Sequence, residues 1–289
     1  MSNSTKNVLD VLTAGAKFLE SKNIENPRLI CEILLSRLLS CPRMELYLKH
    51  NTELSEKKLE AMRRGIKRAA AGEPVQYITG EAGFMNSTFK VDKRALIPRP
   101  ETEVLVNMVL ECKSIWARES PAIVDVGTGS GCIILSLATE KPAGKYLAID
   151  VSEEALALAR ENAAALNLSE RVHFINADLA DVVDPESIDA VVANLPYIPG
   201  NVCETLATQV RDHEPRSALD GGPDGLDIIR SVIQDAGFIL KNGGMIFLEI
   251  GDDQGSKVKN LLEASGFADV SVTQDLNSRD RVVSGTLAM

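Results

Sequence analysis

A glycine-rich loop holds the residues best suited to bind a ligand. Residues 125–131 read Asp-Val-Gly-Thr-Gly-Ser-Gly and lie between an apolar run and a helical pattern. Glycines in a strand-to-helix turn permit a tight turn and a close approach of the backbone to a ligand. Asp150 ends the next apolar run, 19 residues after Gly131. A carboxylate there can accept hydrogen bonds from both hydroxyls of a ribose, so the two features together predict an adenosine site.

The spacing of the glycines distinguishes two kinds of adenosine cofactor. A dinucleotide fingerprint has glycines at its first, third and sixth positions, whereas here the third glycine comes fifth and Cys132 is sixth. This loop, with an aspartate two residues ahead of it, resembles that of methyltransferases that use S-adenosylmethionine (SAM). We therefore expect SAM as cofactor and S-adenosylhomocysteine as product; a dinucleotide, or a tight turn without a ligand, is the alternative. The expected SAM contacts in the loop are Gly127, Thr128, Gly129, Ser130 and Gly131.

Two further residues are candidates to hold the adenine ring. Asp178 closes RVHFINAD, which we expect to form the third strand, and Leu179 follows it. Ligands of such sheets bind at the carboxyl ends of the strands. Asp178 can therefore accept a hydrogen bond from the adenine amine, and Leu179 can cover the face of the ring. Asp178 is equally a residue type that forms turns without any ligand.

A second polar loop ends the fourth apolar run. Residues 191–200 read Val-Val-Ala-Asn-Leu-Pro-Tyr-Ile-Pro-Gly. The lone pair of an amide or aryl amine is delocalised, so an enzyme that methylates such a nitrogen must orient it in line with the methyl donor. The Asn194 side-chain carbonyl and the Leu195 main-chain carbonyl can accept its two N–H groups, while Tyr197 packs against the planar group. We predict that Asn194 and Tyr197 are catalytic and that Asn194, Leu195, Pro196 and Tyr197 bind the substrate; a turn-capping Asn beside an ordinary core Tyr is the alternative.

Strands and helices alternate from residue 122 onward. The apolar runs AIVDV, KYLAID, RVHFINAD, IDAVVAN and GGMIFLEIG predict five strands with helical patterns between them. Such alternation is typical of a parallel, doubly wound sheet. The closing segments DVSVTQD and RVVSGTLAM leave no room for a helix between them and should pair antiparallel. The predicted fold class is α/β, with a Rossmann-like sheet of seven strands when these two are added.

The first part of the chain is helical in pattern. Apolar residues recur at helical spacing through residues 5–72. Asn26 followed by Pro27 predicts a helix start with the asparagine as cap, and Ser55 predicts the cap of a third helix. We expect residues 1–73 to form a separate small helical bundle.

The stretch at residues 74–98 is different in character. The runs VQYIT and STFKVD are β-type and are punctuated by glycine and proline. This pattern predicts a β-hairpin linker. The main SAM-binding domain would then comprise residues 99–289.

Composition argues against several classes of protein. The net charge of −10 disfavours a broad nucleic-acid-binding face, because phosphate contacts need clustered Lys and Arg; the basic residues within 57–68 are interpreted as a solvated helix face. The five cysteines and three histidines are scattered without the spacing of metal ligands, so we expect no metal. MSNSTKNVLD lacks the apolar core of a signal peptide, and no apolar run is long enough to span a membrane. We expect a soluble, cytoplasmic protein.

The loop at residues 194–197, which we call the acceptor loop, by itself resembles two families. Asn194-Leu-Pro-Tyr197 is similar to the loop of ribosomal-RNA adenine dimethyltransferases, whereas the glutamine methyltransferases of peptide-chain release factors (the HemK family) usually read Asn-Pro-Pro-Tyr. An RNA dimethyltransferase would carry a basic face and place its extra domain after the SAM domain. The helical bundle and four further segments are instead similar to the release factor family, so that this resemblance extends from end to end: Gln76–Gly80, Phe84, Leu96–Glu103 and Glu214–Leu226.

The resemblance implies SAM-dependent methylation of the side-chain amide of the glutamine in the Gly-Gly-Gln motif of class-1 release factors. It implies that Asp150, Leu179 and Asn194 contact SAM together with the glycine loop, and that residues 194–197 hold the glutamine. The bundle would help to bind the release factor. Leu195 departs from the family's usual proline, which removes one φ restraint but keeps the carbonyl. We expect direct in-line transfer without a covalent enzyme intermediate, in a monomer that binds neither nucleic acid nor membrane.

Two other functions remain as hypotheses. One is an adenine methyltransferase that acts on RNA, for which a steep salt dependence of RNA binding would be expected. The other, from a different class, is a catalytically inactive module of the same fold that only binds partners. Arg99 and Glu101 are conspicuous in the sequence, but the sequence assigns neither a ligand contact; the alternative without a functional role is that they tie the linker to the sheet.

Overall fold

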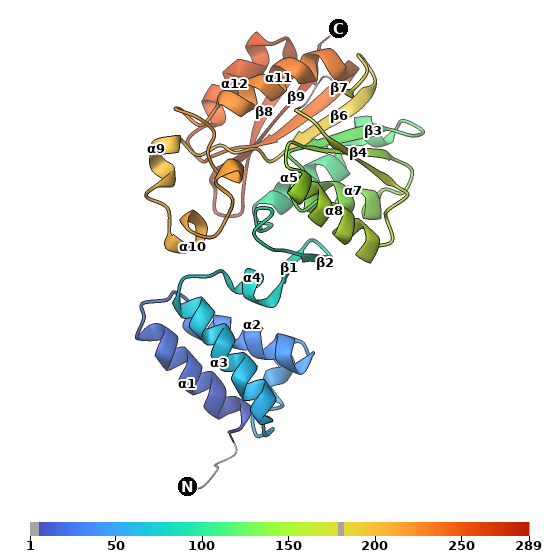
Figure 1. The fold of residues 1–289 in the computed structure, drawn as a ribbon. Coiled ribbons are helices and arrows are strands. Elements are labelled where there is room, and N and C mark those ends of the chain that lie inside the picture. Colours follow the sequence, from blue (N-terminus) through green and yellow to red (C-terminus); the bar gives the residue numbers. More distant parts are fainter. Residues whose placement is uncertain (1–5, 179–181, 289) are drawn as a thin grey trace. The chain divides into compact units, whose positions relative to one another are not determined.

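The computed structural model describes residues 6–178 and 182–288 (Figure 1). The chain divides into two compact units. Unit 1 comprises Met1–Glu81 together with Ala207–His213, and unit 2 comprises Ala82–Leu206 together with Glu214–Met289. Residues 207–213 therefore belong to the first unit although the chain on both sides of them belongs to the second. No helix in the described part of the chain is long and apolar enough to cross a membrane.

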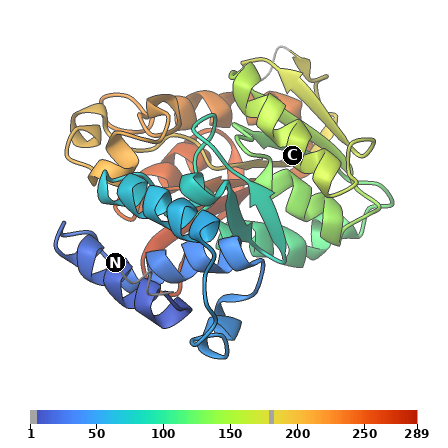
Figure 2. The ribbon, with the colours of Figure 1, turned by 60° about the horizontal axis from the view of Figure 1, so that its bottom comes forward.

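Unit 1 is a small helical bundle around its own apolar core. The long helices α1, α2 and α3 contact one another (Figure 2). Leu12 on α1, Leu35 on α2 and Met62 on α3 are buried almost completely at their common interface. The bounds of the elements in this unit are Val8–Glu20 for α1, Pro27–Leu39 for α2, Arg43–Tyr47 for the 3-10 helix η1, Glu56–Ala70 for α3, Val75–Thr79 for α4 and Thr208–Arg211 for α10.

The predicted helix caps differ in chemistry from those observed. Pro27 is the first residue of α2, as expected, but Asn26 adopts a left-handed conformation with φ of 52° and its side chain makes no capping bond. Ser55 precedes α3 and also makes no side-chain cap. A capping box does form at α1, where the Asn7 side chain accepts from the Asp10 N–H and the Asp10 carboxylate accepts from Asn7 N–H. Asn26 and Ser55 thus occupy the predicted N-cap positions, but neither side chain makes the expected capping hydrogen bond.

The prediction of a strand at VQYIT is wrong. These residues form the short helix α4. Pro74 precedes it with φ of −55°, and Gly80 ends it in a left-handed conformation. The Thr79 hydroxyl donates to the Val75 carbonyl at 3.0 Å within the same turn. Local turn geometry therefore outweighed the β-type composition of the segment.

A β-hairpin follows α4 directly. Strands β1 (Glu81–Phe84) and β2 (Ser87–Lys90) form a two-stranded sheet. Phe84 and Phe89 are both buried, with ring centroids 6.1 Å apart. The Met85 N–H donates to Glu103 Oε1 at 2.7 Å, which fastens the hairpin turn to helix α5 (Thr102–Glu111) of unit 2.

Unit 2 is built on a seven-stranded sheet in the order β5-β4-β3-β6-β7-β9-β8. The first five strands in this order pair in parallel, and β9 pairs antiparallel with both β7 and β8. This confirms the predicted doubly wound sheet and its closing antiparallel pair. The strand bounds are Ala122–Val126 for β3, Lys145–Asp150 for β4, Val172–Asn176 for β5, Ile188–Ala193 for β6, Leu240–Glu249 for β7, Phe267–Gln274 for β8 and Asp280–Leu287 for β9.

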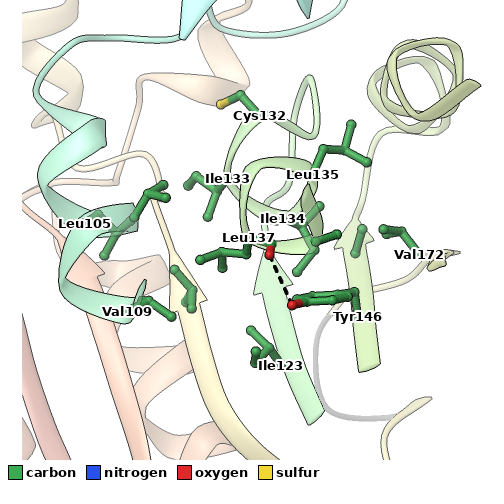
Figure 3. Packing of buried hydrophobic residues seen from close by; sticks show 14 of the residues in the cluster. Leu105, Val109, Ile123, Cys132, Ile133, Ile134, Leu135, Leu137, Tyr146 and Val172 are labelled. Atoms are coloured by element: carbon green, nitrogen blue, oxygen red, sulfur yellow. Dashed lines mark hydrogen bonds between the residues drawn. The ribbon is translucent and has the colours of Figure 1, made fainter. Parts of the chain in front are cut away.

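Helices cover both faces of this sheet. Alternate side chains along a strand therefore pack into two different hydrophobic cores, one on each face. Ile123 packs in the cluster with α5 and α7, whereas its neighbour Val124 packs in the cluster with α11 and α12. Figure 3 shows the first cluster, in which the Tyr146 hydroxyl donates to the Leu137 carbonyl at 3.1 Å. The remaining bounds in unit 2 are Lys113–Trp116 for α6, Cys132–Glu140 for α7, Glu153–Ala165 for α8, Gly200–Cys203 for α9, Arg216–Ala218 for η3, Asp227–Ile239 for α11 and Gly255–Ala264 for α12.

Candidate active site

A cavity of about 440 Å³ opens at the carboxyl ends of strands β3, β4 and β6. This is the place where sheets of this topology bind ligands, and its volume is in the range of small-molecule sites. All of its lining residues belong to unit 2. The predicted site residues among them are Gly127, Gly129, Asp150, Asp178, Asn194, Leu195 and Pro196.

The glycine loop connects β3 to α7 and forms the floor of this cavity. Gly127 has φ of 69°, and a Cβ placed on it would lie 3.2 Å from Leu195. Its N–H donates to the Ile149 carbonyl at 2.9 Å. The position thus needs a glycine on two counts, because the backbone is left-handed and the acceptor loop packs against it.

The predicted loop contacts do not all reach the cavity. Gly127 and Gly129 line it, whereas Thr128, Ser130 and Gly131 are not among the described residues that line it. The buried Thr128 hydroxyl donates to Asp125 Oδ2 at 2.7 Å, and the Ser130 carbonyl accepts from the Asn162 amide at 2.9 Å. These residues hold the loop in shape.

Asp150 stands at the rim with its carboxylate fixed by two main-chain donors. Oδ2 accepts from the Gly129 N–H and Oδ1 accepts from the Ser152 N–H, each at 2.8 Å. Burial raises the pKa of this carboxyl, and the two N–H bonds oppose that rise. Each oxygen of a carboxylate keeps a further lone pair, so Asp150 can still accept the hydroxyls of a ribose.

Asp178 also lines the cavity, beside Ala177 at the end of β5. The structure therefore brings Asp178 to the same cavity as Asp150 and the glycine loop. Leu179, the residue predicted to cover the adenine, lies outside the described residues. The donor set of this cavity fits SAM: a backbone floor without side chains, a carboxylate for the ribose and a second carboxyl group for the adenine amine.

The acceptor loop lies beside the glycine loop, because β6 pairs with β3. Asn194, Leu195 and Pro196 line the cavity. The Asn194 amide Nδ2 donates to Thr102 Oγ1 at 3.1 Å. Within the described chain its Oδ1 accepts no bond, so a strong acceptor is available at the cavity wall.

Tyr197 is not among the residues that line the cavity. Its ring packs against the core beneath α11, and its hydroxyl donates to Glu249 Oε1 at 3.4 Å. Its main-chain carbonyl accepts from the Gln254 side chain at 2.9 Å. Tyr197 therefore braces the loop in this structure, and its predicted contact with substrate stays a prediction.

Two buried residues and one partly buried arginine near the acceptor loop were missed by the sequence reasoning. Thr102 at the start of α5 and Glu249 at the end of β7 are each about 1% exposed, and the positive charge of Arg281 on β9 acts to lower the pKa of Glu249. Burial raises the pKa of Glu249 to about 7. The sequence signal that could have indicated this group of residues was an acid, Glu249, within the apolar run FLEIG. It ends the strand that pairs with β6.

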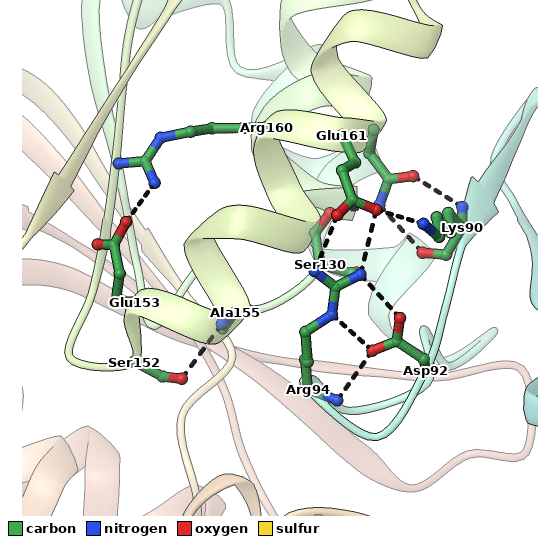
Figure 4. A network of polar contacts seen from close by, with 10 residues as sticks. Lys90, Asp92, Arg94, Ser130, Ser152, Glu153, Ala155, Arg160 and Glu161 are labelled. Carbon is green, nitrogen blue, oxygen red and sulfur yellow. Dashed lines mark hydrogen bonds and ion pairs between the residues drawn. The ribbon is translucent and has the colours of Figure 1, made fainter.

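The segment before α5 forms another part of the cavity wall. Arg94 lines the cavity and lies between Asp92 and Glu161, donating to them at 2.8 and 2.9 Å (Figure 4). Arg99 pairs with the buried Glu214, whose Oε2 also accepts from the Ile97 N–H at 3.2 Å. Glu101 occupies the N-cap position of α5. Arg99 thus ties this segment to the chain that follows the acceptor loop.

Comparison with known folds and families agrees with this geometry. Residues 123–214 match the family described as methyltransferase domain, and residues 10–80 match the family described as PrmC N-terminal domain. In fold the chain is similar to a methyltransferase from Pyrococcus furiosus (TM-score 0.54, 15% identity, 81% of this chain and 100% of that one). It is also similar to the hMettl16 catalytic domain in complex with the MAT2A 3′UTR hairpin 6 (TM-score 0.55, 16% identity, 80% and 83%). In fold the chain is therefore similar to methyltransferases.

Sequence relatives define the family more closely. The release factor glutamine methyltransferase of Chlorobaculum tepidum is 42% identical over 284 residues, covering 96% of this chain and 96% of that protein. The protein of the same name from Moorella thermoacetica is 44% identical over 271 residues, covering 93% and 95%. The chain belongs to the release factor glutamine methyltransferase family, and it is an enzyme whose cofactor is SAM.

Proposed function

We propose that this enzyme methylates the side-chain amide nitrogen of the glutamine in the Gly-Gly-Gln motif of class-1 peptide chain release factors. The observation that carries the proposal is the fixed amide of Asn194 at the cavity wall. Its nitrogen is engaged by Thr102 at 3.1 Å, which leaves its carbonyl oxygen for a substrate N–H. The names of the full-length relatives support the choice of a release factor as substrate.

The proposed mechanism uses the chain to orient an amide rather than to move a proton at the start. SAM supplies an electrophilic methyl group on a sulfonium when it is bound. Asn194 Oδ1 and the main-chain carbonyl of Leu195 accept the two N–H groups of the glutamine and direct its lone pair toward the cofactor side of the cavity. Orientation of this kind can by itself lower the activation free energy by several kcal/mol.

The residues proposed to hold SAM follow the cavity wall. Gly127 and Gly129 offer main-chain groups, Asp150 takes the ribose and Asp178 takes the adenine amine. Asn194 lies where the cofactor and the substrate would meet. Thr128, Ser130 and Gly131 act by holding the loop, which refines their expected role as direct contacts.

Unit 1 is proposed to bind the body of the release factor, while unit 2 performs the transfer. This division accords with the match of residues 10–80 to the PrmC N-terminal domain. We further propose that the enzyme is cytoplasmic, because its proposed substrate is a translation factor. We also propose that it works as a monomer and that it binds no nucleic acid directly. The net charge of −10 supports the last point.

Transfer of labelled methyl from SAM tests the proposal. The enzyme is offered a class-1 release factor, the same factor with the motif glutamine replaced by alanine, and ribosomal RNA. We expect label on the unmodified factor alone. Label on RNA would favour the adenine methyltransferase, and SAM binding without any transfer would favour an inactive binding module.

A further inference from the structure

The chain directly after the acceptor loop is bonded to a second segment, residues 219–226, which also belongs to unit 2. The Ile198 N–H donates to the Leu219 carbonyl at 3.0 Å. The Ile198 carbonyl in turn accepts from the Gly221 N–H at 2.9 Å. Both main-chain hydrogen-bonding groups of the residue that follows the loop are therefore held by this one segment.

Two glycines of the 219–226 segment lie close against the backbone of the acceptor loop. A Cβ placed on Gly221 would lie 2.5 Å from the Pro196 carbonyl oxygen. A Cβ placed on Gly225, whose φ is 76°, would overlap the Tyr197 carbonyl oxygen. Both positions are well inside van der Waals contact, so a side chain at either one would displace the loop.

The side chain of Gln254 joins the loop and the segment to the turn that follows β7. Gln254 is 3% exposed, and its Nε2 donates to the Tyr197 carbonyl at 2.9 Å and to the Gly225 carbonyl at 3.4 Å. Its Oε1 accepts from the Gly251 N–H at 2.9 Å. A main-chain carbonyl can only accept and a main-chain N–H can only donate. The amide of Gln254 therefore has one orientation that satisfies all of these partners.

This amide does not serve the helix to which Gln254 belongs. Gln254 is the N-cap residue of α12, and its side chain makes no capping hydrogen bond. Ser, Thr, Asp and Asn are the residues that cap helices well, and a good cap contributes about 1 kcal/mol. The N-cap position of α12 thus lacks that stabilisation, and its side chain holds the acceptor loop instead.

The peptide unit between Tyr197 and Ile198 is consequently bonded at both of its polar atoms. Its carbonyl accepts from Gln254, and its N–H donates to Leu219. The plane of this peptide cannot rotate without breaking one of the two bonds.

The other end of the acceptor loop is fixed by the sheet, since β6 pairs with β3 as far as Ala193. Residues 194–196 are all that lie between this anchor and the bonded peptide, and Pro196 among them has a restricted φ. Leu195 lines the cavity, and its carbonyl accepts no hydrogen bond within the described part of the chain. The direction of that carbonyl is therefore set by the anchors at the two ends of the loop.

We propose that Gln254 is a positioning residue for methyl transfer, which holds the Tyr197 carbonyl and thereby directs the Leu195 carbonyl toward a substrate N–H. The inference rests on the proposed function, because the Leu195 carbonyl matters only if it accepts from the glutamine amide. Without the Gln254 donor the peptide after Tyr197 can rotate, and the substrate amide then lies with its lone pair out of line with the methyl group. Cofactor binding is separate, since Gln254 is not among the described residues that line the cavity.

The first test measures kcat, the KM for a release factor and the affinity for S-adenosylhomocysteine in the full-length enzyme. Gln254→Met keeps the length of the side chain and removes its hydrogen-bonding groups. We expect its kcat to fall about tenfold, because a misplacement of about 1 Å can cost about a hundredfold in rate. The KM and the cofactor affinity should change by less than about threefold, so that kcat and kcat/KM fall together, as for an interaction that acts in the transition state.

Gly225 offers a second route that leaves Gln254 in place. Gly225→Ala puts a methyl group against the Tyr197 carbonyl and 2.9 Å from Gln254 Nε2, and we expect kcat to fall at least as far as in Gln254→Met. Gly243→Ala is the matched control, because its φ of 71° is close to that of Gly225 and no atom of the described chain lies within 4 Å of the added Cβ. Both variants carry the same backbone strain, but only Gly225→Ala displaces the loop. Gly243→Ala should lose stability and keep the wild-type kcat.

The double variant Gln254→Met with Gly225→Ala should be no slower than the slower single variant, because both changes release the same carbonyl. The inference is overturned if Gln254→Met keeps the wild-type kcat, or if Gly243→Ala is slowed as much as Gly225→Ala. It is also overturned if kcat falls only in step with the melting temperature or with cofactor affinity. If Gln254→Met does not fold, the comparison of the two glycine variants decides alone. Failure of the proposed function is distinct, since the wild-type enzyme would then label no release factor.

Discussion

Replacement of Asn194 by alanine is the most direct test of how the cavity is used. The side chain makes one bond to Thr102 at 3.1 Å and leaves one carbonyl oxygen for substrate. Loss of a preorganised polar partner of this kind costs about 2.7–4 kcal/mol in the transition state. Since each 1.36 kcal/mol is a factor of ten, we expect kcat of Asn194→Ala to fall by about 10²–10³.

The same substitution should have little effect on stability. Asn194 is only partly buried, and its one internal hydrogen bond contributes about 1 kcal/mol. The melting temperature should therefore drop by only about 2–4 °C. Affinity for S-adenosylhomocysteine should change little, because the glycine loop and Asp150 remain in place. We therefore expect Asn194→Ala to lose far more in rate than in stability.

The assay is single-turnover transfer of labelled methyl to a release factor, with calorimetry for cofactor binding and stability. Ser271→Ala is the matched control, since it removes one hydrogen bond, to Ser284 at 3.1 Å between β8 and β9, away from the acceptor loop. Its kcat should equal that of the wild type. The role of Asn194 is refuted if Asn194→Ala transfers methyl within about threefold of the wild-type rate, a change of under 1 kcal/mol.

Three further substitutions test the parts that support the cavity. Asp150→Ala removes the charged acceptor at the rim, so calorimetry should show SAM binding weakened about 10–150-fold, as expected for loss of 1.5–3 kcal/mol; unchanged affinity would contradict its role. Gly131→Ala places a Cβ at φ of 79° and 3.0 Å from a carbon of α7, which should lower the melting temperature by about 2–8 °C. Gly237→Ala, with open space around its Cβ, should not lower it. Glu214→Gln removes the charge that pairs with Arg99 and should lower the free energy of unfolding by about 1–3 kcal/mol in denaturant titration; an unchanged value would show that the pair is not structural.

The candidate residues whose places in the fold could be predicted are those that lie in short, recognisable stretches of sequence. The order of strands and helices follows from local apolar periodicity, and the parallel sheet then brings the carboxyl ends of β3, β4 and β6 together. Asp150 ends β4 and Asn194 directly follows β6, and both accordingly reach one cavity. A motif of a few residues is enough when the fold class fixes where the strand ends meet.

The hydrogen bonds behind the acceptor loop could not be predicted in this way. Asn194 and Thr102 are 92 residues apart, and Tyr197 and Glu249 are 52 apart. No periodicity relates such positions, and an isolated threonine or glutamate is ordinary at a helix start or a strand end. The error at residues 75–79 has a different origin, since β-branched and aromatic residues favour strands only where a sheet can accept them. Pro74 and Gly80 bound a segment of five residues that closes a single helical turn instead.

The leucine in the acceptor loop shows how packing can replace a covalent restraint. A proline at position 195 would fix φ, and Leu195 gives up that restraint. The side chain is instead 4% exposed and packs in the core with α11. It also lies against the glycine loop, 3.2 Å from where a Cβ on Gly127 would be. Burial of a leucine is worth about 1.5–3 kcal/mol, more than the entropy of one unrestrained backbone angle. The loop that presents the Asn194 carbonyl is thus in direct contact with the glycine loop, so the Leu195 side chain adds a packing contact to the pairing of β6 with β3 that brings the two loops together.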